Sequence, residues 1–356
     1  MKPVFFLLLV VFALNKMSAQ DLTPVEHDGN TVFIDRNGEI VIENDYDMDK
    51  SEIIRRFLDK EFESYTYPAY NYFSDGLAVA RRTKSFFFIT YSTKYYLLDS
   101  TGNNLKTIER PRFNRFSEGL AVMKSPETGD LKSGLYGYID SSMKWKIEPI
   151  YRYAGNFNEG LALVLNLEGN FGYIDNTGNT AIDFKFEDAH FFREGLAPVK
   201  INGKWGYINK KGKLAINAQY LYAGRFYDGM ARVGNKNALG YINKEGQLIT
   251  GYRYLEAGKF SEGLACVKID DKWGYIDTGG KTAIKADYFF AGDFHEGLAP
   301  VFYEGKWGYI NKEGRLKIYP KFKFAEEFQN GLAKVWEEDD HYYINIKGDK
   351  VFDLDD

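Results

Sequence analysis

A motif of 18 residues recurs through most of the chain and constrains the fold more than any other feature. One copy runs from Gly195 to Gly212 and reads GLAPVKINGKWGYINKKG. A repeat of about 34 residues is typical of proteins whose units bury their apolar faces by stacking on one another. The leading glycine of the motif stands at Gly76, Gly119, Gly160, Gly195, Gly229, Gly263, Gly297 and Gly331.

Each unit predicts three β-strands. Ala197, Val199 and Ile201 alternate with other residues as one face of a first strand. The pair Asn202-Gly203 is typical of a type I′ hairpin turn, and Trp205–Asn209 follows as a second strand. A turn ending at Gly212 leads to a third strand over 213–216. The segment 222–226 is interpreted as the connection to the next unit.

The position after Leu-Ala predicts an exposed edge strand. It is occupied by residues as different as Pro198, Arg232, Cys266, Pro300 and Lys334. Because proline has no backbone N–H, a proline at this position also means that no neighbouring strand needs a hydrogen bond from it. Cys266, the only cysteine of the chain, has no partner for an internal disulfide, and an exposed thiol there could pair between chains. An incidental role for this cysteine is the favoured interpretation.

The recurrent aromatic residues have two interpretations. The favoured one is packing, with one buried ladder of phenylalanines and one of isoleucines. The phenylalanines are Phe157, Phe192, Phe226, Phe260, Phe294 and Phe328, and the isoleucines are Ile174, Ile208, Ile242, Ile276 and Ile310. The alternative is a groove in which rings stack on a ligand. The candidate stacking residues are Trp205, Trp273, Trp307, Tyr207, Tyr275 and Tyr309.

The N-terminal part of the chain departs from the repeat. Residues 1–19 combine Lys2, an apolar run over 4–14 and small residues before position 20, which predicts a cleaved secretory signal. Since a spanning helix needs about 20 apolar residues, no membrane-spanning segment is expected after cleavage. Residues 31–42 are a degenerate half-unit. Apolar residues at helical spacing over 49–62 predict one amphipathic helix that caps the array.

Composition and motifs argue against several classes of function. The chain has 46 Lys+Arg and 50 Asp+Glu, which leaves no basic footprint for a nucleic acid. Its four histidines occupy non-equivalent positions, and the sequence has neither a nucleophile motif nor a metal-ligand or cofactor-binding pattern. The recurrent Glu194, Glu262 and Glu296 are interpreted as polar turn residues. No catalytic, metal or cofactor-binding residue is therefore assigned.

The repeated elements resemble the WG-repeat, or KWG-repeat, family. Its units carry Glu-Gly-Leu-Ala, Lys-Trp-Gly-Tyr-Ile-Asn and a following glycine. The match is close at 204–212, 272–280 and 306–314, while Tyr136, Phe171 and Leu239 replace the tryptophan elsewhere and 141–143 lacks the turn glycine. It covers the chain from about residue 70 to the C-terminus. The resemblance implies a β-rich repeat fold, often in secreted bacterial proteins, and no general activity.

Two architectures satisfy this pattern. We expect an all-β array of about eight three-stranded units. The chain is then divided into a signal (1–19), a half-repeat with a capping helix (20–69) and the array (70–356). An open β-solenoid is favoured, because three strands are few for a propeller blade, and a closed β-propeller is the alternative.

The expected function is non-enzymatic. We expect an exported protein of the periplasm, cell surface or extracellular space that binds or scaffolds an envelope protein through its repeated surface. The alternative is a carbohydrate-binding protein that holds a cell-wall or surface glycan through repeated aromatic rings.

Overall fold

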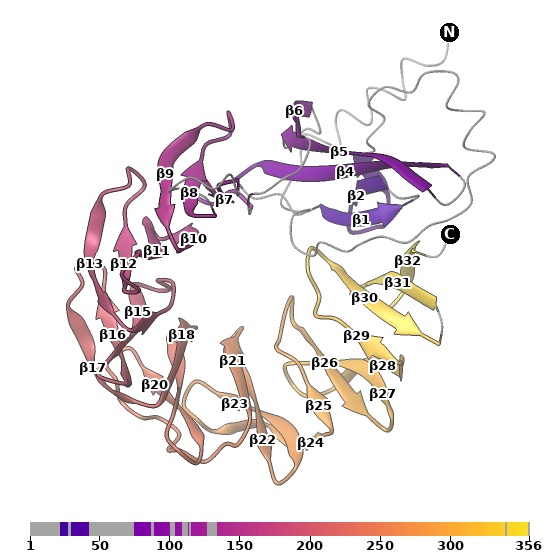
Figure 1. The fold of residues 1–356 in the computed structure, drawn as a ribbon. Helices are drawn as coiled ribbons and strands as arrows, with labels where there is room; N and C mark the ends of the chain where they lie inside the picture. The colour runs from indigo at the N-terminus through magenta and orange to yellow at the C-terminus, as the bar shows by residue number, and fades with distance from the viewer. Residues whose placement is uncertain are drawn as a thin grey trace. The chain divides into compact units, whose positions relative to one another are not determined.

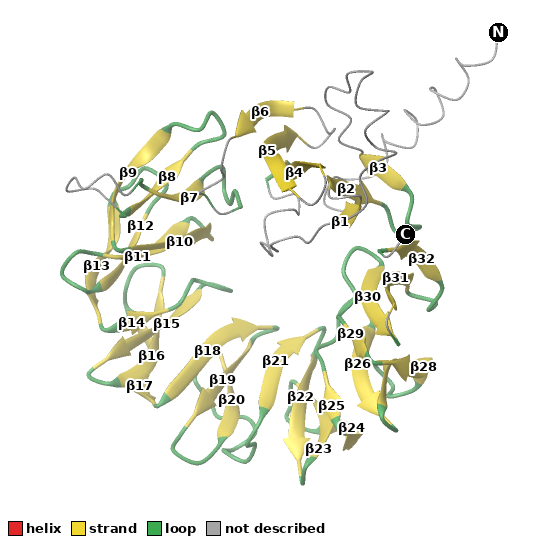
Figure 2. Cartoon of the chain, turned by 45° about the vertical axis from the view of Figure 1, so that its right-hand side comes forward, coloured by secondary structure: helices red, strands yellow, loops and turns green. Residues whose placement is uncertain are grey.

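The structure, a computed structural model, is built from β-strands. It describes residues 22–27, 30–42, 75–86, 89–99, 104–108, 113, 115–126, 134–338 and 340–354, and no helix occurs among them (Figure 2). Two compact units are distinguished: residues up to Pro111 together with Val351–Leu354, and Arg112–Lys350. The expected signal at 1–19 and capping helix at 49–62 lie outside the described residues, as does the expected boundary at 69/70.

The first unit contains a sheet in the order β1-β2-β4-β5-β6, with β3 paired to β2. The half-unit predicted at 31–42 is the hairpin of β2 and β3, closed by the Asp35 carboxylate, which accepts hydrogen bonds from the amides of Asn37 and Glu39. The strands are β1 (Thr23–His27), β2 (Asn30–Ile34), β3 (Ile40–Ile42), β4 (Leu77–Phe86), β5 (Ile89–Asp99) and β6 (Asn104–Ile108), with β32 (Lys350–Asp353) belonging here from Val351 on.

The second unit is a row of seven antiparallel sheets that follow one another along an arc (Figure 1). Each sheet is a meander, in which consecutive strands pair with each other. The first four sheets contain β7 (Ala121–Lys124), β8 (Tyr136–Ile139) and β9 (Trp145–Tyr151); β10 (Tyr153–Asn158), β11 (Leu161–Leu165), β12 (Phe171–Ile174) and β13 (Thr180–Phe186); β14 (Asp188–Ala189), β15 (Leu196–Ile201), β16 (Lys204–Asn209) and β17 (Leu214–Tyr220); and β18 (Tyr222–Tyr227), β19 (Met230–Gly234) and β20 (Leu239–Asn243).

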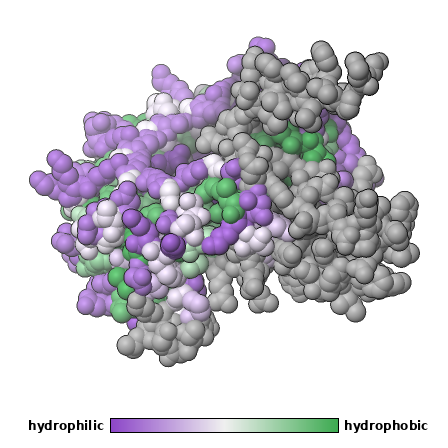
Figure 3. All heavy atoms as spheres, turned by 90° about the horizontal axis from the view of Figure 1, so that it is seen from above, coloured by the Kyte–Doolittle hydropathy of each residue, from purple (hydrophilic) through white to green (hydrophobic). Residues whose placement is uncertain are grey.

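The last three sheets repeat the same meander. They contain β21 (Ala257–Ser261), β22 (Leu264–Ile269), β23 (Lys272–Asp277) and β24 (Thr282–Tyr288); β25 (Phe290–Ala291), β26 (Leu298–Tyr303), β27 (Lys306–Asn311) and β28 (Leu316–Phe322); and β29 (Phe324–Ala325), β30 (Leu332–Glu337) and β31 (Asp340–Asn345). The described surface drawn in Figure 3 is mainly hydrophilic, with hydrophobic residues in small separate groups.

The favoured solenoid and the three-stranded unit are both wrong for this part of the chain. The segment 222–226, interpreted as a connection, is strand β18, which pairs with β19. Its own sheet has the three strands β18–β20, but β10–β13, β14–β17, β21–β24 and β25–β28 form sheets of four strands, as in a propeller blade. In the second unit, moreover, no strand of one described sheet pairs with a strand of the next. The units pack as separate β-propeller blades through their side chains, which is the alternative expectation.

The strand that carries Leu-Ala is central and not at an edge. β15 pairs with β14 on one side and with β16 on the other. Pro198 is tolerated because only its carbonyl is used on this side, accepting the His190 amide at 2.9 Å, while the His190 carbonyl accepts the Tyr173 hydroxyl instead of a backbone N–H. The position is also not exposed: Pro198 is buried, and Cys266 is 4% exposed with its thiol directed at Asp293. Burial raises the pKa of this thiol. The expectation of an exposed thiol that could pair between chains is therefore wrong.

The expected burial of the two ladders is confirmed. Every phenylalanine and isoleucine of the two ladders is at most 3% exposed. Gly206 has a close backbone neighbour, because a Cβ atom there would lie 2.6 Å from the amide nitrogen of Ala218 in β17. The unit without a turn glycine still forms its turn. Met143 takes the left-handed conformation with φ of 63°, and the Asp140 carboxylate accepts the amide of Ser142.

Candidate functional site

The three candidate tyrosines connect neighbouring blades. Tyr207 of β16 is 0% exposed, its hydroxyl donates to the carbonyl of Gly224 in the next blade at 2.8 Å, and its ring centroid lies 5.0 Å from that of Phe226. Burial raises the pKa of Tyr207, so it stays a neutral donor. Tyr275 and Tyr309 repeat these contacts. These rings have no face free for a ligand in this structure.

The three candidate tryptophans lie in three different surroundings. Trp205 is buried to 9% exposure and stacks on His190, with centroids 5.0 Å apart and ring planes at 10°. Trp273 and Trp307 are half-buried. Trp307 lies between two more exposed rings, stacked at 6.4 Å on Phe290 and edge-on at 5.8 Å to Phe324. Only the last two retain ring surface that a ligand can reach.

The recurrent glutamates do more than occupy a polar turn. Glu194 takes a left-handed φ of 54°, and its carboxylate accepts the amide of Gly229 in the next blade at 3.0 Å. Lys244 of that blade lies 3.1 Å from the same carboxylate. Glu118, Glu159, Asp228, Glu262 and Glu296 bind the corresponding glycine of the following blade in the same way. This row of inter-blade hydrogen bonds explains why the position is acidic, and sequence reasoning missed it.

An exposed row of apolar side chains is the strongest candidate for a functional surface. Leu221, Leu255 and Phe289 stand 34 residues apart, where the outer strand of one blade leads into the first strand of the next. They are 41%, 78% and 54% exposed. Phe290 and Phe324, at the following position, are also exposed. We call these five residues the apolar rim.

The backbone holds the apolar rim in place. The amides of Leu221 and Phe289 donate to the carbonyls of Gly234 and Phe302 in the neighbouring strand, each at 3.0 Å. The Lys272 ammonium lies 3.3 Å from the centroid of the Phe289 ring. The side chains therefore project from a hydrogen-bonded backbone rather than from a long loop. The sequence contained a signal for this surface, because apolar residues stand in a connection between strands, where polar residues are favoured.

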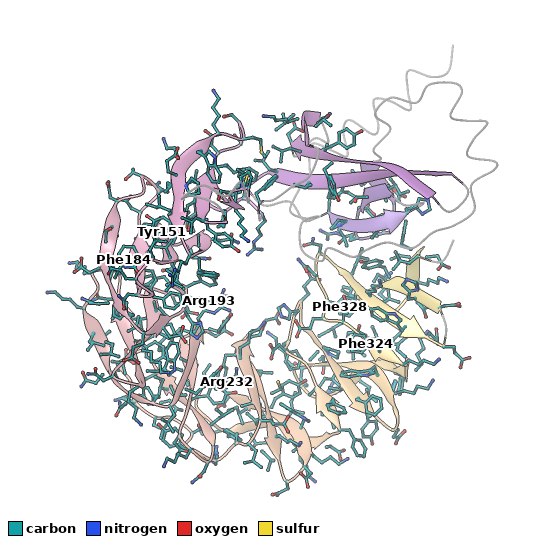
Figure 4. The ribbon with its side chains drawn as sticks, in the orientation of Figure 1. Tyr151, Phe184, Arg193, Arg232, Phe324 and Phe328 are labelled. Atoms are coloured by element: carbon teal, nitrogen blue, oxygen red, sulfur yellow. The ribbon has the colours of Figure 1, made fainter. Side chains whose placement is uncertain are left out.

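The apolar rim continues into an aromatic cluster at the end of the row of blades. The Phe324 ring, labelled in Figure 4, lies 5.2 Å from that of Trp336, and Trp336 stacks on His341. The rings of Phe290, Trp307 and Phe324 complete the cluster. Partly exposed aromatic groups of this kind are enriched where proteins bind one another.

The described residues contain no group of His, Cys, Asp or Glu side chains suited to hold a metal ion. These residues also contain no helix that is long and apolar enough to cross a membrane. The four histidines lie apart: His27 packs on Phe352, His190 on Trp205 and His341 on Trp336, while His295 lies 3.0 Å from the Glu327 carboxylate.

Comparison with solved structures finds matches at low identity. BamB from Moraxella catarrhalis is 10% identical and has a TM-score of 0.41, covering 75% of this chain and 92% of its own. Hsv2 from Kluyveromyces lactis is 10% identical with a TM-score of 0.37, covering 78% and 96%. The WD40 β-propeller domain of Doa1 is 13% identical with a TM-score of 0.30, covering 63% and 88%.

The sequence comparisons give one match. No curated protein matches the chain. The family described as "WG containing repeat" matches residues 136–168, 171–205, 205–237, 240–273, 273–307 and 307–335. These segments cover more than half of the chain and are offset from the blades, since 171–205, for example, runs from β12 and β13 of one blade into β14 and β15 of the next. The chain therefore belongs to the WG-repeat family.

Proposed function

We propose that this protein is a non-enzymatic, exported scaffold whose apolar rim binds a protein partner of the cell envelope. The observation that carries the proposal is the row of Leu221, Leu255 and Phe289, exposed at equivalent positions of successive blades. Export is supported by the signal-like sequence of residues 1–19. The absence of a catalytic motif in the sequence supports a binding role.

Physical chemistry favours a partner at this surface. Exposed apolar side chains recur here in successive blades, and apolar surface that is exposed in this way is typical of interaction sites where it forms a patch. Burying one side chain such as Phe289 in an interface is worth about 1.5–3 kcal/mol. Because the residues stand once per blade, a partner with several apolar side chains can bind two or three blades together. Lys272 beside Phe289 adds a polar border, which is usual around an apolar interface core.

The test compares two variants that carry aspartate at exposed sites. Leu255→Asp and Phe289→Asp together remove the centre of the apolar rim, and Tyr319→Asp changes a residue of β28 that is 75% exposed and lies outside it. Crosslinking of the purified protein to an envelope extract should give one discrete partner with the wild type and with Tyr319→Asp. The rim variant should lose it. A partner retained by the rim variant would contradict the proposed surface.

The non-enzymatic part of the proposal has a separate test. The wild-type protein should turn over no substrate in a broad hydrolase panel. Turnover that disappears when a single carboxylate is replaced would show that the protein is an enzyme.

A glycan remains the second candidate ligand, favoured by the partly exposed rings of Phe290, Trp307 and Phe324. Their stacked and edge-on arrangement offers a platform on which a sugar ring can lie. Trp307→Ala should then abolish retention on a glycan array while the protein remains folded. Loss of the fold would instead identify Trp307 as a packing residue, with a cost of about 3–5 kcal/mol. No binding of the wild type to any glycan would exclude this candidate.

A further inference from the structure

A cavity of about 490 Å³ opens on the second unit, and none of the five residues of the apolar rim lines it. The first strands of two blades, β18 and β21, supply most of its wall. Its aromatic and apolar lining side chains are His190, Tyr222, Tyr227, Met230 and Phe260. Arg193 and Arg232 lie toward the concave side of the arc in Figure 4. The volume is within the range of small-molecule sites, about 300–1,000 Å³.

The cavity has an excess of positive charge. Arg225, Arg232 and Lys259 line it, against one carboxylate, Asp293, which lies 3.5 Å from the Lys259 ammonium. Arg193 lies beside it, with its guanidinium 4.0 Å from the centroid of the Tyr227 ring. In the part of the chain that the structure describes, none of these three arginines forms an ion pair.

Aromatic rings hold the cations in place. The guanidinium of Arg225 lies 5.7 Å from the ring centroids of Phe191 and Tyr227, and Lys259 lies 5.6 Å from that of Tyr227. Such contacts fix a cation without neutralising its charge. The charge of Arg225 therefore stays available to an anion that enters the cavity, while that of Lys259 is shared with Asp293.

Arg232 is held in a fixed orientation. Its guanidinium donates to the hydroxyl of Tyr222 at 2.8 Å and to the carbonyl of Ala257. Its Nε atom is buried and has no hydrogen-bond partner in the structure. A buried donor without an acceptor is costly, and an anionic ligand would lower that cost. The equivalent positions of the flanking blades hold Pro198 and Cys266, so packing of the repeat does not require an arginine here.

The position of Arg225, like that of Arg232, holds different residue types in different blades. The position of Arg225 is occupied in successive blades by Asn156, Phe191, Arg225, Lys259, Asp293 and Glu327. Blade packing tolerates all six residues, and the positive ones fall in two neighbouring blades. His190 adds no charge at neutral pH, because burial lowers its pKa and Arg225 lowers it further, against the opposing effect of Asp188.

We propose that this cavity binds a small organic anion. Arg225 and Arg232 would contact an oxyanion, a carboxylate or a phosphate ester, since guanidinium groups match the geometry of both. Tyr222, Tyr227, Met230 and Phe260 would contact the apolar part of the ligand. This site is distinct from the apolar rim and does not depend on the proposed protein partner.

The test uses three probes that share a ring and differ in charge: phenyl phosphate, benzoate and benzyl alcohol. Calorimetric titration of the wild-type protein should show saturable 1:1 binding of at least one anion and none of benzyl alcohol. The anion that binds more tightly identifies the chemistry as phosphate ester or carboxylate. Its affinity should fall as salt is added, because the contact is between charges.

Substitutions then locate the site. Arg225→Gln should weaken binding of the preferred anion at least tenfold, and Lys259→Gln provides a second test should the first variant fail to fold. Arg152→Gln removes an exposed arginine from another connection and should leave binding unchanged. The proposal is overturned if neither anion shows saturable binding at millimolar concentration. It is also overturned if the lining variants bind as the wild type does.

Discussion

The interior between the blades and the surface of the same blades follow opposite rules. At interior positions the residue type repeats, as at Tyr207 and Phe226, where each blade contributes the same two rings to the contact with its neighbour. At surface positions such as Arg225 and Leu255 the residue changes from blade to blade, or is apolar without packing. Residues that recur therefore report how the blades pack. Residues that depart from the repeat are where this protein differs from a generic array.

The largest expected effect compares an interior with a rim residue. Tyr207→Ala removes a buried ring and a hydrogen bond to the next blade, and should lower the free energy of unfolding by about 3–5 kcal/mol. Leu255→Ala, at a side chain 78% exposed, should change it by less than about 0.5 kcal/mol. Urea denaturation measures both. Equal effects would remove the distinction between interior and rim.

A second comparison concerns two glycines of adjacent blades. Gly206→Ala would place a Cβ atom 2.6 Å from a backbone nitrogen of β17, which cannot move without disturbing the sheet. We expect a loss of about 1–3 kcal/mol. At Gly224 the nearest atom to a new Cβ would lie 3.4 Å away, an ordinary contact. Gly224→Ala should thus be nearly neutral, and a larger loss there than at Gly206 would contradict the packing described.

A third comparison tests the one turn in which a larger residue replaces the turn glycine. Met143 has φ of 63°, whereas Gly178 holds the same position in the next blade with φ of 88°. Met143→Gly should raise stability by about 0.5 kcal/mol, because relief of the left-handed strain exceeds the entropy cost of glycine. Gly178→Ala should lower stability. Thermal unfolding of the two variants should therefore shift in opposite directions, and shifts of the same sign would disprove the strain.

The smallest expected effect is the pH dependence of the stability that the inter-blade glutamates contribute. Burial alone would raise the pKa of Glu262, but the Lys312 ammonium at 3.0 Å and the Gly297 amide outweigh it and lower the pKa below its usual value. A carboxyl with a lowered folded-state pKa stabilises the protein above its unfolded pKa, about 4.3. That stabilisation is lost as pH falls through the lower folded value.

Glu262→Gln removes this titration, so the wild type should lose more stability than the variant between pH 5 and pH 3. The difference should be about 0.5 kcal/mol, since the pair is partly exposed to solvent. Glu313→Gln, at an exposed turn position, is the control. Thermal midpoints measured across this range provide the comparison. Parallel pH profiles for wild type and Glu262→Gln would show that the carboxylate does not stabilise the contact.

Part of the candidate site was open to prediction from the sequence. The 34-residue period placed the phenylalanine and isoleucine ladders in the interior, because a side chain that recurs in every unit must satisfy the same contact each time. The tyrosines were included as ligand candidates because a ring that recurs in the sequence gives the same pattern whether it is buried in the core or binds a ligand. Their hydroxyl bonds to the next blade, such as Tyr207 to Gly224, depend on atoms 17 residues away.

The sequence by itself determined the repeat, the β-strands, most turns and the buried faces, since these depend on residues close together in the chain. Only the tertiary structure decided between solenoid and blades, because a strand with one buried face shows the same alternation whether its unit pairs with the next or packs against it. It also placed Arg225, Arg232 and Lys259 around one cavity. Clusters of this kind form between blades, because the packing of one blade on the next brings together residues that are distant in the sequence.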